Sequence, residues 1–190
     1  MFICRVVLMV VLATSGAAMA QGTDGAGIDP TAGKGSVRNN VYTNPFFGFT
    51  YTIPKDWKVI RGPEQISKQG GCPKDQCVLL EVQSHTGTGR VEIKAVQLRP
   101  GGTAKEIVQK FAGQEETYGM KAAGPQGESQ GGSLKLSRAD YQSPDPSAPV
   151  FETLVVTTAK GNALLFTILS DSQNLRTELT SGITGTEEAK

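Results

Sequence analysis

The sequence has little of several residue types on which many catalytic and metal sites depend. Its 190 residues include one histidine, one tryptophan and three cysteines. A single histidine excludes a zinc site built from several histidines and leaves only His85 as the base of a catalytic triad. We interpret His85 as a solvent-exposed turn residue, because it follows Ser84 at the end of a predicted strand. The sequence therefore favours a protein that is not an enzyme and that needs no cofactor.

The chain also lacks an excess of either charge. Lysine and arginine together number 19, and aspartate and glutamate number 18, which gives a net charge of +1. A nucleic-acid-binding domain carries a concentrated basic surface, so we expect no nucleic-acid partner. Any partner would be recognised by a local patch and not by the overall charge.

Residues 1–20 have the pattern of a secretory signal peptide. Arg5 precedes the apolar run Val6–Leu12, and the small-residue site Ala18-Met19-Ala20 follows it. We expect cleavage after Ala20 and export to the periplasm or the extracellular space. The apolar run is too short to cross a bilayer, so the mature chain is predicted to have no transmembrane segment.

The segments at the two ends of the mature chain are predicted to be unstructured. Residues 21–40 are rich in glycine and contain only Ile28 and Val37 as large apolar side chains. Such a segment buries too little surface to offset its conformational entropy, so we expect a disordered linker. Residues 41–184 would form one folded domain, and residues 185–190 a flexible tail.

Two cysteines, Cys72 and Cys77, remain once the predicted signal peptide with Cys4 is removed. Cysteines of an exported chain most often pair, so we expect a disulfide within the loop Ile66–Gln76. A redox-active pair is the alternative, but such motifs usually have two intervening residues and this one has four.

The hydrophobic pattern predicts strands with two helices among them. Phe47, Phe49, Tyr51 and Ile53 alternate with smaller residues, as in a half-buried strand. A helix is expected over Thr103–Tyr118, where Thr103 and Glu106 have capping-box spacing, although Glu115 interrupts the apolar stripe. Ser172 would cap a last helix in which Leu175, Leu179 and Ile183 recur every four residues. Both would flank a mainly antiparallel sheet in an α+β fold. The other predicted strands are Asp56–Ile60, Val78–Gln83, Val91–Leu98, Leu134–Tyr141, Phe151–Thr158 and Ala163–Ser170.

The segment from Tyr42 to Trp57 resembles the start of PsbP-like domains. There an F-G-F-x-x-x-x-P-x-x-W strand opens the fold, and Phe47–Trp57 matches that pattern. We expect Trp57, which follows the aromatic strand, to be a buried anchor of the core. The resemblance extends to about Ile183 and implies an αβα sandwich. It also implies a protein that assembles with other proteins, mostly without catalysis. The family includes extrinsic subunits of the photosynthetic oxygen-evolving complex and many secreted bacterial proteins, so the resemblance names no partner.

Charged residues on neighbouring strands have two interpretations. Arg138 and Asp140 share one face of a predicted strand, and Glu152 lies on the next strand. They form either a polar pocket or an exposed row of ion pairs, and the second is the commoner arrangement.

We expect an exported, non-enzymatic module that docks onto an unknown envelope or extracellular protein. The alternative is a periplasmic carrier of a small apolar or glycan ligand. The docking surface is expected on the loops Ile66–Gln76 and Ser143–Pro149, which a disulfide and three prolines stiffen. The candidate binding residues are Tyr42, Phe46, Lys68, Lys74, Asp75 and Asp145.

Overall fold

The computed structural model describes residues 27–124 and 126–186, and the predicted signal peptide lies outside them. The described chain forms a short 3₁₀ turn, three α-helices and twelve strands. In chain order these are η1 (Pro30–Gly33), β1 (Ser36–Arg38), β2 (Val41–Asn44), β3 (Phe49–Thr52), β4 (Lys58–Arg61), α1 (Pro63–Lys68), β5 (Gln76–Gln83), β6 (Arg90–Gln97), α2 (Ala104–Thr117), β7 (Lys121–Ala122), β8 (Gly127–Gly131), β9 (Leu134–Gln142), β10 (Phe151–Ala159), β11 (Asn162–Ser170), α3 (Gln173–Ser181) and β12 (Ile183–Gly185).

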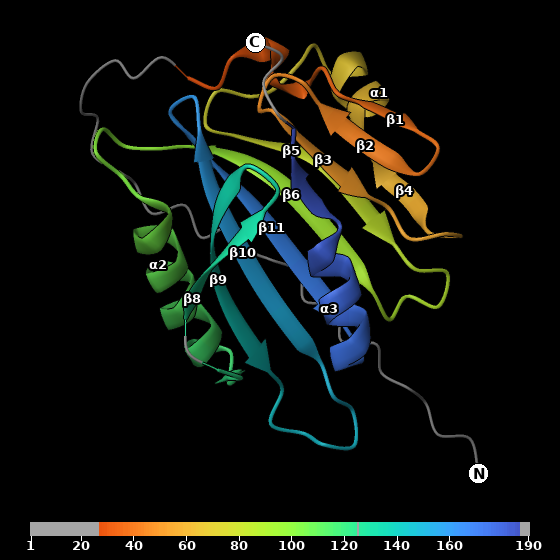
Figure 1. Ribbon diagram of the computed structural model, residues 1–190, viewed down its shortest axis with the longest axis vertical. Helices are drawn as coiled ribbons and strands as arrows, with labels where there is room; N and C mark the ends of the chain where they lie inside the picture. The colour runs from red at the N-terminus through yellow and green to blue at the C-terminus, as the bar shows by residue number, and fades with distance from the viewer. Residues whose placement is uncertain (1–26, 125, 187–190) are drawn as a thin grey trace.

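A large antiparallel sheet forms the centre of the molecule (Figure 1). Its strand order is β4-β5-β6-β11-β10-β9-β7, and β8 pairs with β9 as well. The predicted hairpins β5–β6 and β10–β11 are both present. The expected α+β class with a mainly antiparallel sheet is confirmed.

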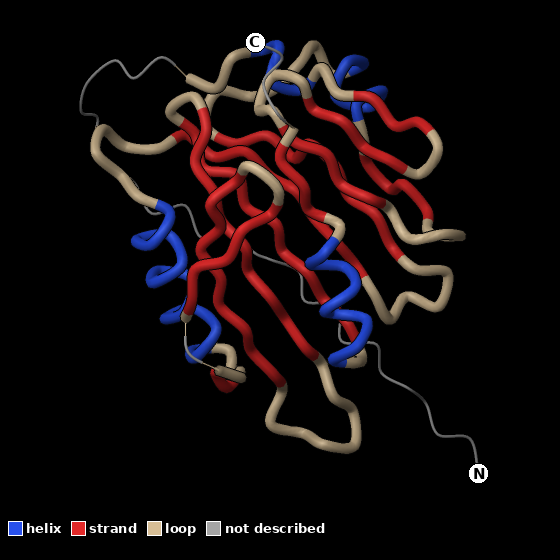
Figure 2. Tube along the Cα trace, in the orientation of Figure 1, coloured by secondary structure: helices blue, strands red, loops and turns tan. Residues whose placement is uncertain are grey.

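A second, smaller sheet joins distant parts of the chain. Its order is β1-β2-β3-β12, so the aromatic strand β3 pairs with β12, which follows the last helix. In the trace of Figure 2 these strands lie together beside the large sheet. Ile183, which the sequence pattern assigned to the last helix, belongs to β12 instead, because α3 ends at Ser181.

Both faces of the central strands are covered, as their uninterrupted apolar runs predict. On one face Val155 and Phe166 pack with the small sheet and with Leu179 of α3. On the other face Leu154 and Val156 pack against α2. Thr103 and Glu106 form the predicted capping box at the start of α2, with the Glu106 amide donating to Thr103 Oγ1 over 3.2 Å.

The prediction of a disordered linker over residues 21–40 is wrong for residues 27–40. Ile28 and Ala32 are 2% and 0% exposed, and residues 36–38 form an edge strand of the small sheet. Buried Asn44 holds this segment, because its Nδ2 donates to the Ala32 carbonyl over 2.8 Å. Two buried apolar side chains and one buried amide thus help to order a glycine-rich segment that is largely polar in sequence.

The predicted flexible tail is wrong for its first two residues. Gly185 pairs with Phe49 in the small sheet, and the Thr186 amide donates to the Gly48 carbonyl over 2.9 Å. Residues 187–190 lie outside the described part of the chain.

The predicted loop Ile66–Gln76 begins inside a helix. Helix α1 covers Pro63–Lys68, with Pro63 at a position that favours helix starts and buried Ile66 facing the core. None of the helices in the described residues has the length and apolar character that a membrane span needs.

Candidate binding site at the ends of β9 and β10

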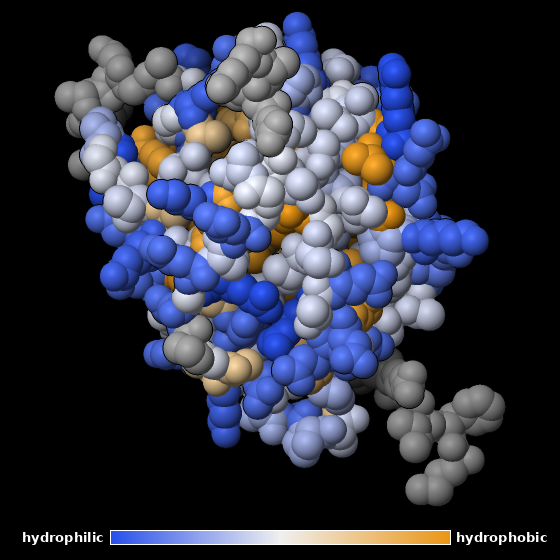
Figure 3. All heavy atoms as spheres, viewed as in Figure 1, coloured by the Kyte–Doolittle hydropathy of each residue, from blue (hydrophilic) through white to orange (hydrophobic). Residues whose placement is uncertain are grey.

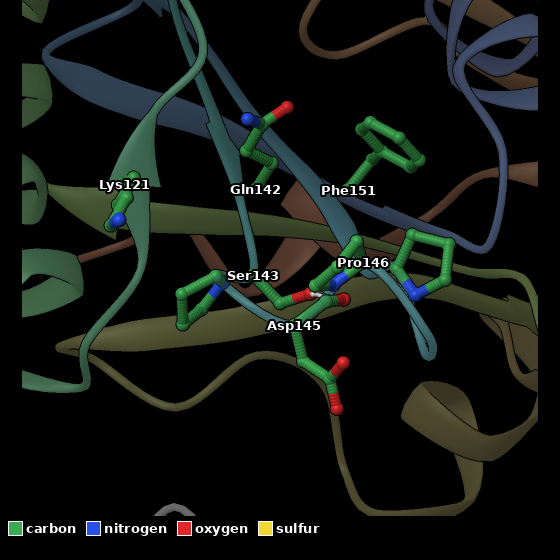
Figure 4. Close-up of a pocket in the computed structure, with 8 residues that line it drawn as sticks. Lys121, Gln142, Ser143, Asp145, Pro146 and Phe151 are labelled. Atoms are coloured by element: carbon green, nitrogen blue, oxygen red, sulfur yellow. Dashed lines mark hydrogen bonds between the residues drawn. The ribbon is translucent and has the colours of Figure 1, made fainter.

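A surface pocket of about 360 Å³ lies where β9 and β10 end and the loop 143–150 joins them. In Figure 4 the side chains of Gln142 and Phe151 stand on the same side of the sheet, and Lys121 approaches from β7. The carboxylate of Asp145 points away from them in that view. The lining residues are Lys121, Gln142, Ser143, Pro144, Asp145, Pro146, Pro149 and Phe151.

Hydrogen bonds hold the loop that forms this pocket. Ser143 and Val150 close it, because the Val150 amide donates to Ser143 Oγ over 3.0 Å and the Ser143 amide to the Val150 carbonyl over 2.8 Å. Within the loop, Asp145 Oδ1 accepts from the hydroxyl of Ser147 over 2.7 Å and from its amide over 2.9 Å. These bonds, the hydroxyl's foremost, lower the pKa of Asp145. With three prolines fixing backbone angles as well, the loop has few conformations to lose on binding.

A cluster of charged residues, the arginine cluster, lies next to the pocket on the same face of the sheet. It consists of Arg138 and Asp140 on β9 and Arg176 on α3. The Nε of Arg138 lies 3.0 Å from both carboxylate oxygens of Asp140, and Thr153 donates to Asp140 Oδ1 over 2.5 Å. Arg176 Nη1 is 3.9 Å from the same oxygen. The arrangement is a partly buried polar site, not the exposed row of ion pairs that is commoner.

Arg176 is unusual for a helix residue because it is only 5% exposed. Its guanidinium lies 5.4 Å from the ring centre of Phe151, which also lines the pocket. Figure 3 shows strongly hydrophilic residues gathered on this face between β8 and α3. Phe151 therefore links the pocket to the arginine cluster.

The third predicted member of this polar group, Glu152, faces the opposite side of the sheet. It meets Glu115 of α2 there, and Glu115 is 7% exposed. Burial raises the pKa of Glu152 to about 8, helped by the charge of Glu115 and by a hydrogen bond between the two side chains. Burial also raises the pKa of Glu115. The protonated form of Glu152 is thus favoured at neutral pH, beside the carboxyl group of Glu115.

The other predicted binding residues lie far from the pocket. Gln76, next to the disulfide, pairs with Val96 of β6. Across the next two strands, Val96 pairs with Ala163 of β11, and Ala163 pairs with Thr158 of β10. Phe151 is at the other end of β10, so the disulfide loop and the loop 143–150 occupy opposite ends of the large sheet. Lys68, Lys74 and Asp75 are exposed at the disulfide end.

The aromatic candidates are less exposed than predicted. Tyr42 was expected at the surface, but it is 0% exposed. Its hydroxyl accepts a hydrogen bond from Asn44 Nδ2 over 3.0 Å, which satisfies the polar group inside the core. Phe46 is half-buried, with the Lys160 ammonium 4.5 Å from its ring centre. Tyr42 is therefore not part of a binding surface.

The expected pairing of Cys72 with Cys77 is present, with a Cα–Cα distance of 5.1 Å. We predict that the double variant Cys72→Ala/Cys77→Ala loses about 2 kcal/mol of stability, because it frees a short loop in the unfolded chain. Urea denaturation with and without reductant measures this loss. Reductant should destabilise the native protein by a similar amount and leave the variant unchanged. Two free thiols in freshly purified protein would contradict the pairing.

Residues Gly127–Gly131 have the Gly-x-Ser-x-Gly pattern of many serine hydrolases. In serine hydrolases this pattern forms a sharp turn between a strand and a helix, which presents the serine. Here it makes up strand β8, which pairs with β9, and Ser129 is exposed on it. His85 lies in the exposed turn between β5 and β6. Within the described residues there is also no group of three or more His, Cys, Asp or Glu that could hold a metal ion.

Comparison with known proteins matches the fold alone. No family model and no curated protein matches the chain. The solution structure of cyanobacterial PsbP (CyanoP) from Synechocystis sp. PCC 6803 matches with a TM-score of 0.52 at 12% identity, over 89% of this chain and 98% of that one. The crystal structure of LpqN, involved in cell envelope biogenesis of Mycobacterium tuberculosis, matches with a TM-score of 0.45 at 9% identity, over 73% of this chain and 83% of the LpqN chain. A Bacteroides thetaiotaomicron structure gives 0.43 at 14% identity, over 80% of this chain and 50% of that one.

The chain therefore has a PsbP-like α+β fold, as its opening aromatic strand predicts. The similarity covers nearly the whole of the cyanobacterial protein. Since one fold serves many functions, the function has to be inferred from the site.

Proposed function

We propose that this protein is an exported, non-catalytic module that docks onto another protein of the cell envelope or the extracellular space. The observation that carries the proposal is the stiff, hydrogen-bonded loop 143–150 around an open pocket at one end of the sheet. A loop that is already ordered loses little entropy when a partner binds, so its contacts contribute more of their energy to affinity. The signal-peptide pattern of residues 1–20 supports export.

Docking accounts for the structure better than transport of a small apolar or glycan ligand. A carrier would need the aromatic strand to line a cavity, but the rings of β3 fill the core. Phe49 lies 5.7 Å from Tyr42 and 5.4 Å from Phe166 between ring centres. The aromatic face is thus occupied by the protein itself.

A second proposed contact surface lies around the disulfide. Lys68, Lys74 and Asp75 are exposed there, and the Cys72–Cys77 bond stiffens the chain between them. The Ile28 amide donates to the Lys74 carbonyl over 2.8 Å, which fixes the backbone at this point.

Replacing residues 144–149 with a Gly-Ser linker of equal length tests the proposal. We expect the variant to keep its melting temperature within about 4 °C, because the replaced residues are exposed. It should lose the partner that wild-type protein captures by crosslinking in its native envelope, as identified by mass spectrometry. A matched replacement of residues 85–88 in the β5–β6 turn should keep the partner. Undiminished capture by the 144–149 variant would exclude this loop as the docking surface.

A further inference from the structure

The arginine cluster contains two positive charges and one negative charge. Asp140 Oδ1 already accepts from Arg138 over 3.0 Å and from Thr153 over 2.5 Å, which leaves Arg176 Nη1 at 3.9 Å. Among the described residues, Asp140 is the only carboxylate within 4 Å of either arginine. The site therefore carries a net charge of about +1 in a partly buried position, where charges are normally paired.

Arg176 has hydrogen-bond donors that the protein does not use. Both Nε and Nη1 are shielded from solvent and have no acceptor within the described structure. A buried donor without a partner costs about 1–3 kcal/mol, and more when the group is charged. Such a group in a native protein calls for an acceptor that the chain itself does not supply.

Two other arginines show why this one is exceptional. Arg61 and Arg90 also have a buried, unpartnered Nε. However, Arg61 Nη2 donates to Gln69 over 2.7 Å, and Arg90 Nη2 lies 3.0 Å from a Glu81 oxygen. Among the described residues Arg176 has no side-chain contact of that quality, since its Nη1 lies 3.9 Å from the Asp140 carboxylate.

Two carboxylates close to Arg176 in the described part of the sequence have other surroundings. Glu152 follows Phe151 in sequence but faces α2 on the opposite side of the sheet. Glu178 is on α3 but lines a different pocket, together with Thr52 and Pro54. Among the residues that the structure describes, none therefore offers Arg176 a second carboxylate.

The site can be reached from the docking surface. The side chain of Arg138 is 26% exposed, and Phe151 contacts Arg176 and lines the pocket. Gln142 pairs with Phe151 in the strand register, two residues from the pair Asp140–Thr153. The pocket and the arginine cluster thus form one continuous strip on the same face.

We propose that the arginine cluster binds a carboxylate from an acidic segment of the docked protein, while the adjacent pocket holds the residues beside it. The carboxylate would bind beside the exposed part of Arg138 and offset the positive charge of Arg176 that Asp140 does not balance. Planar guanidinium groups suit carboxylates particularly well, because they offer several donors in one plane. This inference rests on the proposed docking function and specifies the chemistry of the partner.

The test uses the mature protein and two synthetic peptides, acetyl-Ala-Pro-Glu-Phe-amide and the same peptide with glutamine in place of glutamate. We expect the glutamate peptide to shift the NMR Nε–Hε signals of Arg138 and Arg176 in a saturable way. The glutamine peptide should bind at least tenfold more weakly. Free glutarate is the third probe, and tighter binding of glutarate than of the peptide would overturn the assignment to a protein segment.

Three variants separate binding from structural support. Arg176→Met and Arg138→Gln should each lower the affinity for the glutamate peptide at least tenfold. Arg176→Lys should bind the peptide more tightly than Arg176→Met does. Arg90→Gln, on the opposite face of the sheet, should leave it unchanged. If Arg176→Met does not fold, Arg138→Gln decides, because Arg138 is the more exposed of the pair. Equal binding of both peptides to wild type, or unchanged affinity in Arg138→Gln, would overturn the proposal.

The failure of this inference can be told from a failure of the docking function. If replacement of residues 144–149 abolishes capture of the partner and Arg138→Gln does not, the docking surface stands and the carboxylate site is wrong. If the peptide binds as expected but the 144–149 variant still captures the partner, the site binds carboxylates and the loop is not the docking surface.

Discussion

Phe49→Ala is expected to lower the free energy of unfolding by about 3–5 kcal/mol, among the largest losses for a single side chain in this fold. Phe49 is 0% exposed and lies in β3, where its ring makes edge contacts with Tyr42 and Phe166. Its removal would open a cavity between the small and large sheets, because the pairing of β3 with both neighbours prevents the backbone from closing the space. Urea denaturation followed by the fluorescence of Trp57 measures the loss.

Thr52→Ala is the matched control for this prediction. Thr52 lies on the same strand but is exposed, so its substitution should change stability by less than about 0.5 kcal/mol. Equal losses for the two variants would mean that the aromatic face of β3 is not the core contact described here.

Glu152→Gln is expected to make the protein more stable at pH 8 by about 1–3 kcal/mol and to leave it nearly unchanged at pH 5. The folded protein holds the Glu152 proton up to about pH 8, whereas the unfolded chain releases it near its ordinary pKa of 4.5. Between these values the folded state binds more protons, so stability falls as the pH rises. A glutamine at position 152 still offers a hydrogen-bond donor to Glu115, but it has no carboxyl group that could lose a proton.

Denaturant unfolding at pH 5, 6.5 and 8 tests this pH dependence. Glu116→Gln is the control, since Glu116 neighbours Glu115 on α2 but is exposed. The free energy of unfolding of Glu116→Gln should change with pH as that of wild type does. The free energy of unfolding of Glu152→Gln should change less with pH. If the stability of Glu152→Gln varied with pH just as that of wild type does, the pKa of Glu152 would not be raised in the folded protein.

The sequence predicts most of the large sheet because local patterns determine those elements. The apolar runs of Leu154–Val156 mark a strand covered on both faces, and the spacing of Thr103 and Glu106 marks the start of α2. The apolar stripe of that helix is interrupted by Glu115. This interruption is the one feature of the sequence that indicates the buried carboxyl pair.

Features that depend on distant contacts could not be predicted in this way. Tyr42 is buried because Asn44 satisfies its hydroxyl, and Trp57, expected to be a buried anchor, is only half-buried. The burial of Arg176 is the clearest case of a feature that the sequence does not reveal, since an arginine in a polar helix is normally solvent-exposed. Only the packing of α3 over Phe151 reveals its burial.

The pairing of β3 with β12 has a consequence for the order of folding. The hydrogen bond from Thr50 Oγ1 to the Thr184 carbonyl spans a sequence separation of 134 residues. β2 can pair with β3 early, but the pairing with β12 and the contact of Phe49 with Phe166 must wait for the later parts of the chain. A chain emerging from its amino end therefore keeps the rings of β3 uncovered until most of the protein has been made. Closing so long a loop is also slow, since its entropy must be lost before the contact forms. During that interval Phe49 and Tyr51, both 0% exposed in the folded protein, are open to misassociation.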